Sequence, residues 1–367
     1  MNEQELQQVI ESFAPASLQE SWDNSGWNVN LHPENIRGVL VCLDVTPEAV
    51  QAARQAGCSV IVSHHPLLFR AVKRIDADRE PGRCLSALLS AGISLYCAHT
   101  SADSTLGGIN TWLAGAFGLV NARPLEPQDV RLCKLAVTVP EDDAPRIRQA
   151  LSNAGAGSLG EYTDCTFSVA GTGTFRPSAA AHPAIGTARE LATVREVRIE
   201  ALVEEPRAAA AANAVRRAHP YEMPAIDIYR LESTDQGRSG LGAAGDLKEQ
   251  VTLADFAARV KQALGISTLR VAGSLDSMVR RVGVCGGAGH DLITAAEKSG
   301  CDVFVTGELR HNSYYDYDIA LIEAGHYHTE KCFVDIMCDA LRMSEPVIQY
   351  KVDVRGFHEL GRPYIDY

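Results

Sequence analysis

Five of the eleven histidines of this 367-residue chain fall within three short segments. His64 and His65 are adjacent and follow three apolar residues and Ser63, His99 lies in a second segment, and His326 and His328 lie in a third. A β-branched run bounded by a loop residue and a proline is typical of a buried strand, and α/β sheets place their chemistry at the carboxyl ends of such strands. Two imidazoles that leave one strand tip diverge, which suits two metal ions better than one.

Carboxylates accompany these histidines. Asp103 lies four residues after His99, and Glu330 lies four residues after His326. Nitrogen and carboxylate ligands favour borderline cations, namely zinc, manganese, iron or cobalt, over calcium. Two such ions about 3.5 to 4 Å apart would activate water and hold a leaving oxygen.

The opposing interpretation is structural. A single histidine near a strand end is usually a satisfied core or surface residue, because most histidines make only local contacts. The clustering favours a metal site. Spacing alone leaves one choice open: His328 shares a strand face with His326, whereas His326 and Glu330, four apart, would share a helical face.

An internal repeat organises the chain. Residues 38–66 match residues 281–309 without a gap, and each copy is expected to form a strand, a helix and a strand. In the first copy a proline opens the helix and Gly57 ends it. Residues 88–92 and 321–325 also match, and both are expected to be a helix end that leads to a further strand or turn.

Short strands that alternate with helices imply βαβ crossovers, so the predicted fold class is α/β, with two similar halves and mostly parallel sheets that form one metal-binding core. Residues 130–232 interrupt this core. Their predicted order is βαββαβ, which indicates an α+β ferredoxin-like insert. The polar flanks 124–129 and 233–240 are typical of linkers. The predicted domains are therefore 1–129, 130–232 and 233–367.

Composition narrows the function. The net charge of -12 argues against a nucleic-acid partner, since such binding needs a basic face. No apolar stretch approaches the roughly 20 residues that span a bilayer, and the first residues lack a signal-peptide layout, so we expect a cytoplasmic protein without a membrane partner. The ten cysteines are scattered without a CxxC pair, which predicts small core residues rather than disulfides or a zinc-thiolate site.

Five short segments, in order along both halves, resemble the GTP cyclohydrolase 1 type 2 homologue family. They are ESWDNSG at 20–26, SHHPL at 63–67, HTSAD at 99–103, TGE at 306–308 and GHYHTE at 325–330. The middle of the chain, which contains His219-Pro220-Tyr221-Glu222, resembles the inserted PII-like domain of longer members. The resemblance therefore covers nearly the whole chain.

The resemblance implies a dinuclear metal centre in a toroidal homohexamer built as a trimer of dimers. The implied ligands are His64, His65, Asp103, His326 and Glu330. The family motif thus favours His326 over His328. It leaves His99 to orient Asp103 or to relay a proton, with a purely structural role as the alternative.

Three further features of the sequence each have two interpretations. Glu308 matches His65 in the repeat and is, with His99, a candidate catalytic residue, although it is as well placed to cap a following helix. Residues 286–289 follow a strand and open a helix, where backbone amides hold phosphate, but a tight turn with positive φ explains these glycines equally well. The segment Trp22-Asp23-Asn24 is predicted to be a packed turn rather than a substrate clamp.

Charge suggests the substrate class. Two divalent ions bring four positive charges and Asp103 and Glu330 return two, which suits an anionic substrate. The leading hypothesis is a metal-dependent hydrolase acting on a nucleotide-like or phosphorylated small molecule. The alternative is a non-catalytic regulatory or scaffold hexamer that binds metal and senses a ligand through the insert.

Overall fold

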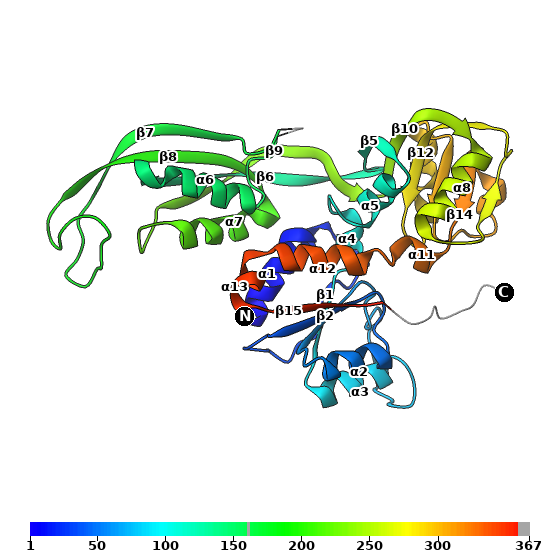
Figure 1. Ribbon diagram of the computed structural model, residues 1–367, viewed down its shortest axis with the longest axis horizontal. Coiled ribbons are helices and arrows are strands. Elements are labelled where there is room, and N and C mark those ends of the chain that lie inside the picture. Colours follow the sequence, from blue (N-terminus) through cyan, green and yellow to red (C-terminus); the bar gives the residue numbers. More distant parts are fainter. Residues whose placement is uncertain (160–161, 359–367) are drawn as a thin grey trace. The chain divides into compact units, whose positions relative to one another are not determined.

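A computed structural model of the chain describes residues 1–159 and 162–358. The chain divides into two compact units: Met1–Gln128 with Gly237–Tyr367, and Asp129–Gln236. The first unit contains two sheets and the second unit contains one (Figure 1). A mixed α/β fold is therefore confirmed.

The first sheet is parallel except at one edge. Its strands, in spatial order, are β1 (Gly26–Val29), β4 (Ser94–Cys97), β3 (Val60–Ser63), β2 (Gly38–Cys42) and β15 (Asp353–Phe357), with only β1 antiparallel. β2 and β3 are buried along their whole length, as expected for central parallel strands. Because β15 comes from the C-terminal segment, the second half of the chain completes the sheet of the first half.

The second sheet is mixed. Its strands, in spatial order, are β11 (Arg270–Ala272), β14 (Ala320–Glu323), β13 (Val303–Thr306), β12 (Met278–Cys285), β10 (Ala243–Thr252) and β5 (Leu119–Arg123). Only β12, β13 and β14 are parallel, so the prediction of a mostly parallel sheet is wrong for this half. Antiparallel strands tolerate a solvent-facing side, and the edge strand β5 has only one buried residue, Leu119.

Strand pairing confirms the repeat and corrects one part of it. Val60 pairs with Ser94 in β4, and its repeat counterpart Val303 pairs with Ala320 in β14. β14 is therefore the counterpart of β4. The prediction that residues 321–325 form a helix end is wrong, because the apolar residues there are buried within a parallel strand. A short apolar run fits a buried strand as well as a helix, so its composition could not decide.

Helices cover both faces of the first sheet (Figure 1). α2 (Pro47–Gln55) and α3 (Gly82–Ala91) pack on one face, and α1 (Glu3–Phe13) and α12 (Phe333–Met343) pack on the other. A single hydrophobic cluster joins the second face to the second sheet, so the two halves share a core. The other helices of this unit are α4 (Thr100–Ser104), α5 (Ile109–Ala116), α8 (Leu253–Leu264), α9 (Ile293–Lys298), α10 (Ser313–Asp316), α11 (His326–Glu330) and α13 (Glu345–Tyr350).

The second unit has the predicted βαββαβ order. Its elements are β6 (Glu126–Pro140), α6 (Ala144–Asn153), β7 (Thr166–Phe175), β8 (Ala192–Glu204), α7 (Glu205–Ala218) and β9 (Ile226–Leu241), with the strands in the spatial order β7-β8-β6-β9. Alternate residues of β6 and β8 pack against both helices in one core.

The flanks of this unit are not loop linkers. β6 begins at Glu126 and β9 continues to Leu241, so most of the segments 124–129 and 233–240 belong to long strands. Polar composition misled the prediction, because backbone hydrogen bonding in a sheet does not depend on side-chain polarity.

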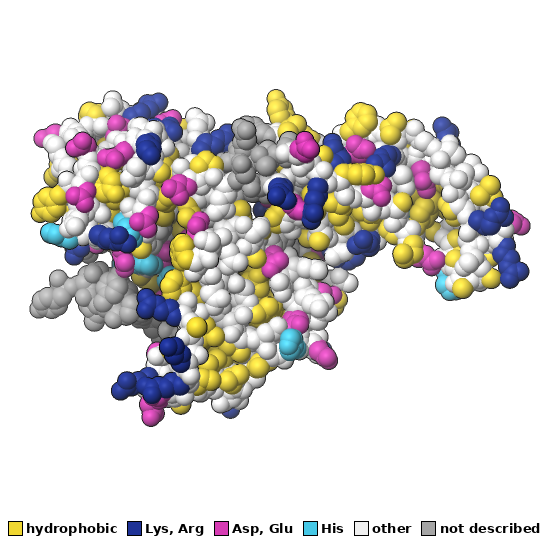
Figure 2. Space-filling view, turned by 180° about the vertical axis from the view of Figure 1, so that it is seen from behind, with side chains coloured by type: hydrophobic (Ala, Val, Ile, Leu, Met, Phe, Trp, Pro, Cys, Tyr) yellow, Lys and Arg dark blue, Asp and Glu magenta, His cyan; other side chains and the backbone are white. Residues whose placement is uncertain are grey.

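Other expectations concern the surface and the cysteines. No described helix combines the length and the apolar character needed to cross a bilayer. Lys and Arg side chains are intermixed with Asp and Glu side chains over the face shown in Figure 2. All ten cysteines are free and all except Cys165 are buried, as predicted for small core residues.

Candidate metal centre

The first unit gathers the predicted ligands at the carboxyl ends of parallel strands. His64 and His65 directly follow β3, and Asp103 lies in α4, shortly after β4. His326 and Glu330 are the first and last residues of α11, which follows β14. β3 and β4 belong to the first sheet and β14 to the second, so the cluster forms where segments that follow parallel strands of both sheets come together.

Glu330 lies at the centre of this cluster. Its Oε2 atom is 3.0 Å from His65 Nε2 and 2.9 Å from His326 Nε2. Its Oε1 atom is 3.7 Å from His64 Nε2, which in turn is 3.9 Å from Asp103 Oδ1. Each carboxylate oxygen therefore faces a different set of donors.

Two buried atoms in the cluster test whether a cation fits. His64 Nε2 and Asp103 Oδ1 have no hydrogen-bond partner among the described residues. The separations of 3.7 and 3.9 Å around His64 Nε2 are too long for hydrogen bonds. They are near the distance of about 3.4 Å expected between two ligands that bind one tetrahedral ion at about 2.1 Å. The donor set therefore fits a divalent cation.

Each histidine ring is oriented by a contact on the side that faces away from the cluster. In each of four rings, Nδ1 contacts an acceptor and Nε2 is left for the cluster, an arrangement that fixes the tautomer and orientation of metal-binding histidines. The Nδ1 contacts are His64 to Ala98 O at 3.1 Å, His65 to Asp44 Oδ1 at 2.7 Å, His99 to Asp23 Oδ1 at 2.7 Å, and His326 to Glu308 Oε1 at 3.2 Å. Sequence reasoning did not identify Ala98, Asp44 or Asp23 in these roles.

His99 is held by Asp23. A ligand atom of His99 lies within 4.8 Å of those of His64 and His65, so His99 also faces the cluster. Its ring donates to Asp23, and no hydrogen bond joins this ring to Asp103 among the described residues, so the expected role of orienting Asp103 gains no support. Asp23 also accepts from the Thr100 hydroxyl at 2.6 Å. Asp23 in the segment 22–24 thus orients a histidine of the site, whereas Trp22 is exposed rather than packed, which keeps a substrate contact as its alternative role.

Glu308 lies at the edge of the cluster. Its carboxylate contacts the outer nitrogen of His326, and its side chain is 60% exposed. α10 shows no side-chain cap, so the alternative role of helix capping gains no support. The geometry gives Glu308 a positioning contact with His326, and its catalytic role stays a prediction.

The second-half histidines differ in position. His326 and Glu330 lie four residues apart on α11 and make the contact expected of a shared helical face. His328 is buried in the same helix and packs edge-on against Tyr327, with ring centroids 5.5 Å apart. Among the described residues, His328 belongs to none of the groups that could hold a metal.

The glycine backbone amides of the segment 286–289 form hydrogen bonds within the protein, which leaves them unavailable to bind a phosphate. The amide of Gly286 donates to Asn110, that of Gly287 to Thr329, and that of Gly289 to Thr306. These donors are therefore already used. Gly287 has φ +60°, and a methyl group there would overlap Glu330 Oε1. The turn interpretation is the one that fits, and the absence of a side chain makes room for the central carboxylate.

In the metal-free cluster, burial and the neighbouring ionisable groups shift the pKa values of the ligands. Burial, and then the neighbouring Glu330, raise the pKa of Asp103 to about 7. Burial would also raise the pKa of Glu330, but the hydrogen bonds of His326 and His65 and the nearby His64 ring outweigh it and hold that pKa well below its usual range. The pKa of His65 is raised to about 10, because Asp44 and Glu330 outweigh the effect of burial.

These shifts predict how the stability of the metal-free protein depends on pH. Asp103 and His65 both bind a proton more tightly in the folded state. The contribution of Asp103 is full below about pH 4 and is lost as the pH rises through about 7, and that of His65 is full below about 6.5 and is lost through about 10. The midpoint temperature of thermal unfolding of the chelator-treated protein should therefore decrease as the pH is raised from about 6 to about 9.

Thermal unfolding at several pH values checks this expectation. Asp103→Asn and His65→Gln should each make the fall shallower. Added divalent metal should also oppose it, because ligands must lose protons to bind a cation. A midpoint that rises over this range would contradict the assigned shifts.

Gly287→Ala should displace Glu330 and lower metal content, measured by elemental analysis after gel filtration. Gly300→Ala is a matched control, because Gly300 has φ +71° and no atom within 4 Å of an added Cβ. Both variants strain a left-handed residue by about 1 kcal/mol, but only the first obstructs the carboxylate. Equal metal content in the two variants would refute the role given to Gly287.

Known proteins provide the family assignment. The model of the Duf34/NIF3 (NGG1p interacting factor 3) family matches residues 1–359. The chain is 39% identical over 331 residues to a GTP cyclohydrolase 1 type 2 homolog of Bacillus subtilis, covering 89% of this chain and 88% of that protein. It is 37% identical over 330 residues to a protein of the same name from Mycobacterium tuberculosis, covering 88% of this chain and 86% of that one.

A solved structure extends the comparison to the fold. The structure of a Bacillus cereus protein related to NIF3 matches with a TM-score of 0.75 and 36% identity, covering 100% of this chain and 99% of that chain. The resemblance to the GTP cyclohydrolase 1 type 2 homologue family, inferred from five short segments, is therefore confirmed. The chain belongs to the Duf34/NIF3 family.

Proposed function

We propose that Glu330 bridges two divalent cations. One would lie between His64, Asp103 and Glu330 Oε1, and the other between His65, His326 and Glu330 Oε2. The support is the division of donors between the two carboxylate oxygens and the two buried atoms without hydrogen-bond partners. The donor set, imidazole and carboxylate, fits zinc, manganese, iron or cobalt.

The function that this arrangement supports best is metal-dependent hydrolysis of a nucleotide-like or phosphorylated small molecule. Two bound divalent ions would supply Lewis acidity, activating water and stabilising negative charge that develops on the substrate. With two carboxylates among the five ligands, the centre keeps a positive surplus that attracts an anion. The observation that carries this proposal is that the two carboxylate oxygens of Glu330 contact different histidines.

Two exposed aromatic side chains beside the proposed metal centre would suit a planar group of the substrate. Trp22 and Phe69 are 58% and 48% exposed, although large aromatic side chains usually find apolar cover. Their rings lie 6.1 Å apart, and each lies against the His99 ring, at 6.1 and 6.3 Å. A nucleobase would stack on this aromatic wall.

A cavity of about 570 Å³ adjoins the same wall. His65 and Asp44 line its inner end, and Phe69 and Arg70 line it further out. A guanidinium at this place is suited to a phosphate or another anionic group of the substrate. The base of a nucleotide would thus contact Phe69, and its phosphate would contact Arg70.

His99 is the candidate for proton transfer. Its Nδ1–H is committed to Asp23, so its Nε2 atom is available to take or give a proton beside the cluster. Glu308 would act differently, by keeping His326 oriented through the outer ring nitrogen. Both assignments extend the roles expected from the sequence.

The assembly belongs to the same proposal. We infer a homohexamer, built as a trimer of dimers, from the resemblance of the chain to its family. The insert would be PII-like, which its βαββαβ order supports. The second candidate function, a regulatory or scaffold hexamer, is favoured by one observation, a cavity in the insert.

Elemental analysis paired with a hydrolysis screen of nucleotides and phosphoesters tests the function. The wild type should carry near two metals per chain and hydrolyse a member of the screen. His64→Ala and Glu330→Ala should lose metal and turnover together, whereas His32→Ala, which changes an exposed histidine outside the cluster, should keep both. Two metals without turnover would favour the regulatory candidate, and less than one metal per chain would contradict the site.

Trp22→Ala should weaken substrate binding without affecting the metals. Loss of one stacking surface should raise KM about tenfold for the substrate identified in the screen, with kcat within about twofold. Trp112→Ala, which removes a partly exposed tryptophan from α5, is the control. An unchanged KM, or lost metal, would show that Trp22 does not form the substrate wall.

A further inference from the structure

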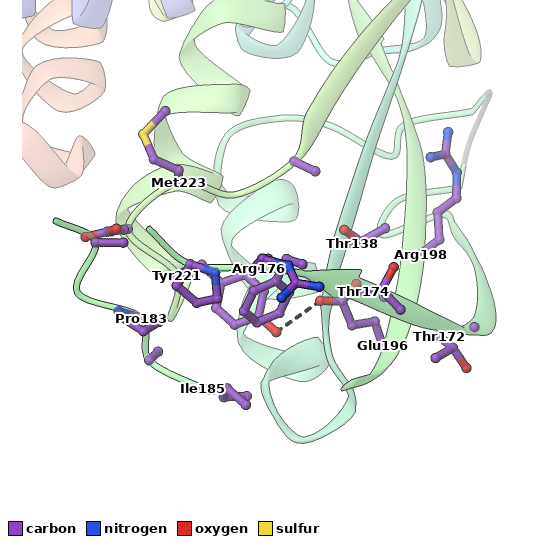
Figure 3. Close-up of a pocket in the computed structure, with 18 of the residues that line it drawn as sticks. Thr138, Thr172, Thr174, Arg176, Pro183, Ile185, Glu196, Arg198, Tyr221 and Met223 are labelled. Carbon is purple, nitrogen blue, oxygen red and sulfur yellow. Dashed lines mark hydrogen bonds between the residues drawn. The ribbon is translucent and has the colours of Figure 1, made fainter. Parts of the chain in front are cut away.

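The insert has a cavity of about 630 Å³ that belongs entirely to the second unit. It lies on the sheet face opposite the helices, because Val197 packs in the helix-facing core while its neighbours Glu196 and Arg198 line the cavity. Figure 3 shows side chains from the sheet, from the loop after β7 and from the segment after α7 gathered around it. The volume is in the usual range for small-molecule sites.

One wall is built by His219-Pro220-Tyr221-Glu222, a segment that the metal centre does not use. His219 Nε2–H donates to Thr138 O at 2.9 Å, and its Nδ1 accepts from the Tyr221 amide at 3.0 Å. Burial of His219 lowers its pKa, which keeps the ring neutral in this role. The turn is therefore fixed, and it presents the Tyr221 ring to the cavity.

The same segment holds the loop that closes the cavity. Both carboxylate oxygens of Glu222 lie near the backbone amide of His182, which donates at 3.3 and 3.4 Å. Pro183 and Ile185 follow in that loop and face the cavity. The cavity thus has an ordered rim on the side away from the sheet.

Glu196 is the unusual group in this cavity. Its side chain is only 9% exposed, and its Oε1 atom accepts from the Tyr221 hydroxyl at 3.0 Å. Arg176 and Arg198 also line the cavity, but no described Lys or Arg forms an ion pair with Glu196: Arg176 donates to Arg189 O, and Arg198 pairs with Glu200 and Asp227. A buried carboxylate with a single hydrogen bond keeps strong acceptor capacity, and burying it without a cation is costly.

Two further features define the surroundings of this carboxylate. Gly173 lies so close to Glu196 that a methyl group there would overlap its carboxylate, so the glycine makes room for this side chain. The rings of Phe175 and Tyr221 meet edge to face, with centroids 5.7 Å apart, and both line the cavity beside Glu196 (Figure 3). Aromatic faces next to a buried anion suit a flat cation.

We propose that this cavity binds a small planar aromatic or heteroaromatic molecule whose edge presents a cation or paired N–H donors to Glu196. The ring would pack against Phe175 and Tyr221, and the donors would form charge-assisted hydrogen bonds with the carboxylate. This site is independent of the proposed metal centre, so it would exist whether or not the protein is a hydrolase.

Benzamidine is the probe, because it joins a flat ring to two parallel N–H donors, and benzoate is its anionic counterpart of the same shape. Binding to the full-length protein is measured by saturation-transfer NMR and calorimetry, with and without chelator. Benzamidine should bind in both conditions, and benzoate at least about tenfold more weakly. Glu196→Gln should weaken benzamidine at least about tenfold, because the amide still accepts from Tyr221 but carries no charge.

Glu200→Gln is the matched control, since it removes a carboxylate from the same face of β8 outside the cavity lining. It should leave benzamidine binding unchanged. If Glu196→Gln fails to fold, Phe175→Leu provides the test by removing the ring while keeping apolar volume, and it should weaken binding several-fold. Equal binding of benzoate, unchanged binding by both variants, or no benzamidine binding by the wild type would overturn the proposal.

Discussion

The structure depends on burying the carboxylate of Glu330 among imidazole rings. A carboxylate taken from water is costly unless positive charge or hydrogen bonds compensate it, and Glu330, at 3% exposure, receives contacts from His64, His65 and His326. Those rings are oriented in turn from outside, which leaves little freedom at the centre. The same constraint explains why Gly287, beside the carboxylate, has no side chain.

The repeated fold makes that constraint possible. β3 and β14 lie in different sheets that share one core, and the segments after them bring residues about 260 positions apart in the sequence into contact. β15 ties the C-terminal segment into the first sheet, so neither half supplies a complete site. The cluster is therefore a product of the shared core rather than of a local motif, and its rigidity follows from central strands buried on both faces.

Adjacent histidines after an apolar run, and a Glu four residues after a His, indicate a metal site, but the set of five ligands follows only from the resemblance to the family. The partners Asp44 and Asp23 were missed, since they lie close to the rings only after folding. The composition of residues 321–325 predicts a helix end although they begin within β14, because composition does not separate a buried strand from a helix. The polar residues at the start of β6 and the end of β9 predict linkers although they lie in strands. Family resemblance, rather than spacing, chose His326 over His328.

The central claim is that Glu330 divides two ions between its two oxygens. Metal per chain, measured by elemental analysis in three isosteric or near-isosteric variants, tests it most directly. The account predicts that Asp103→Asn and His326→Gln each keep about one of two metals, because each removes a ligand of a different ion, and that Glu330→Gln loses both. Equal loss in all three variants, or full metal content in Glu330→Gln, would contradict it.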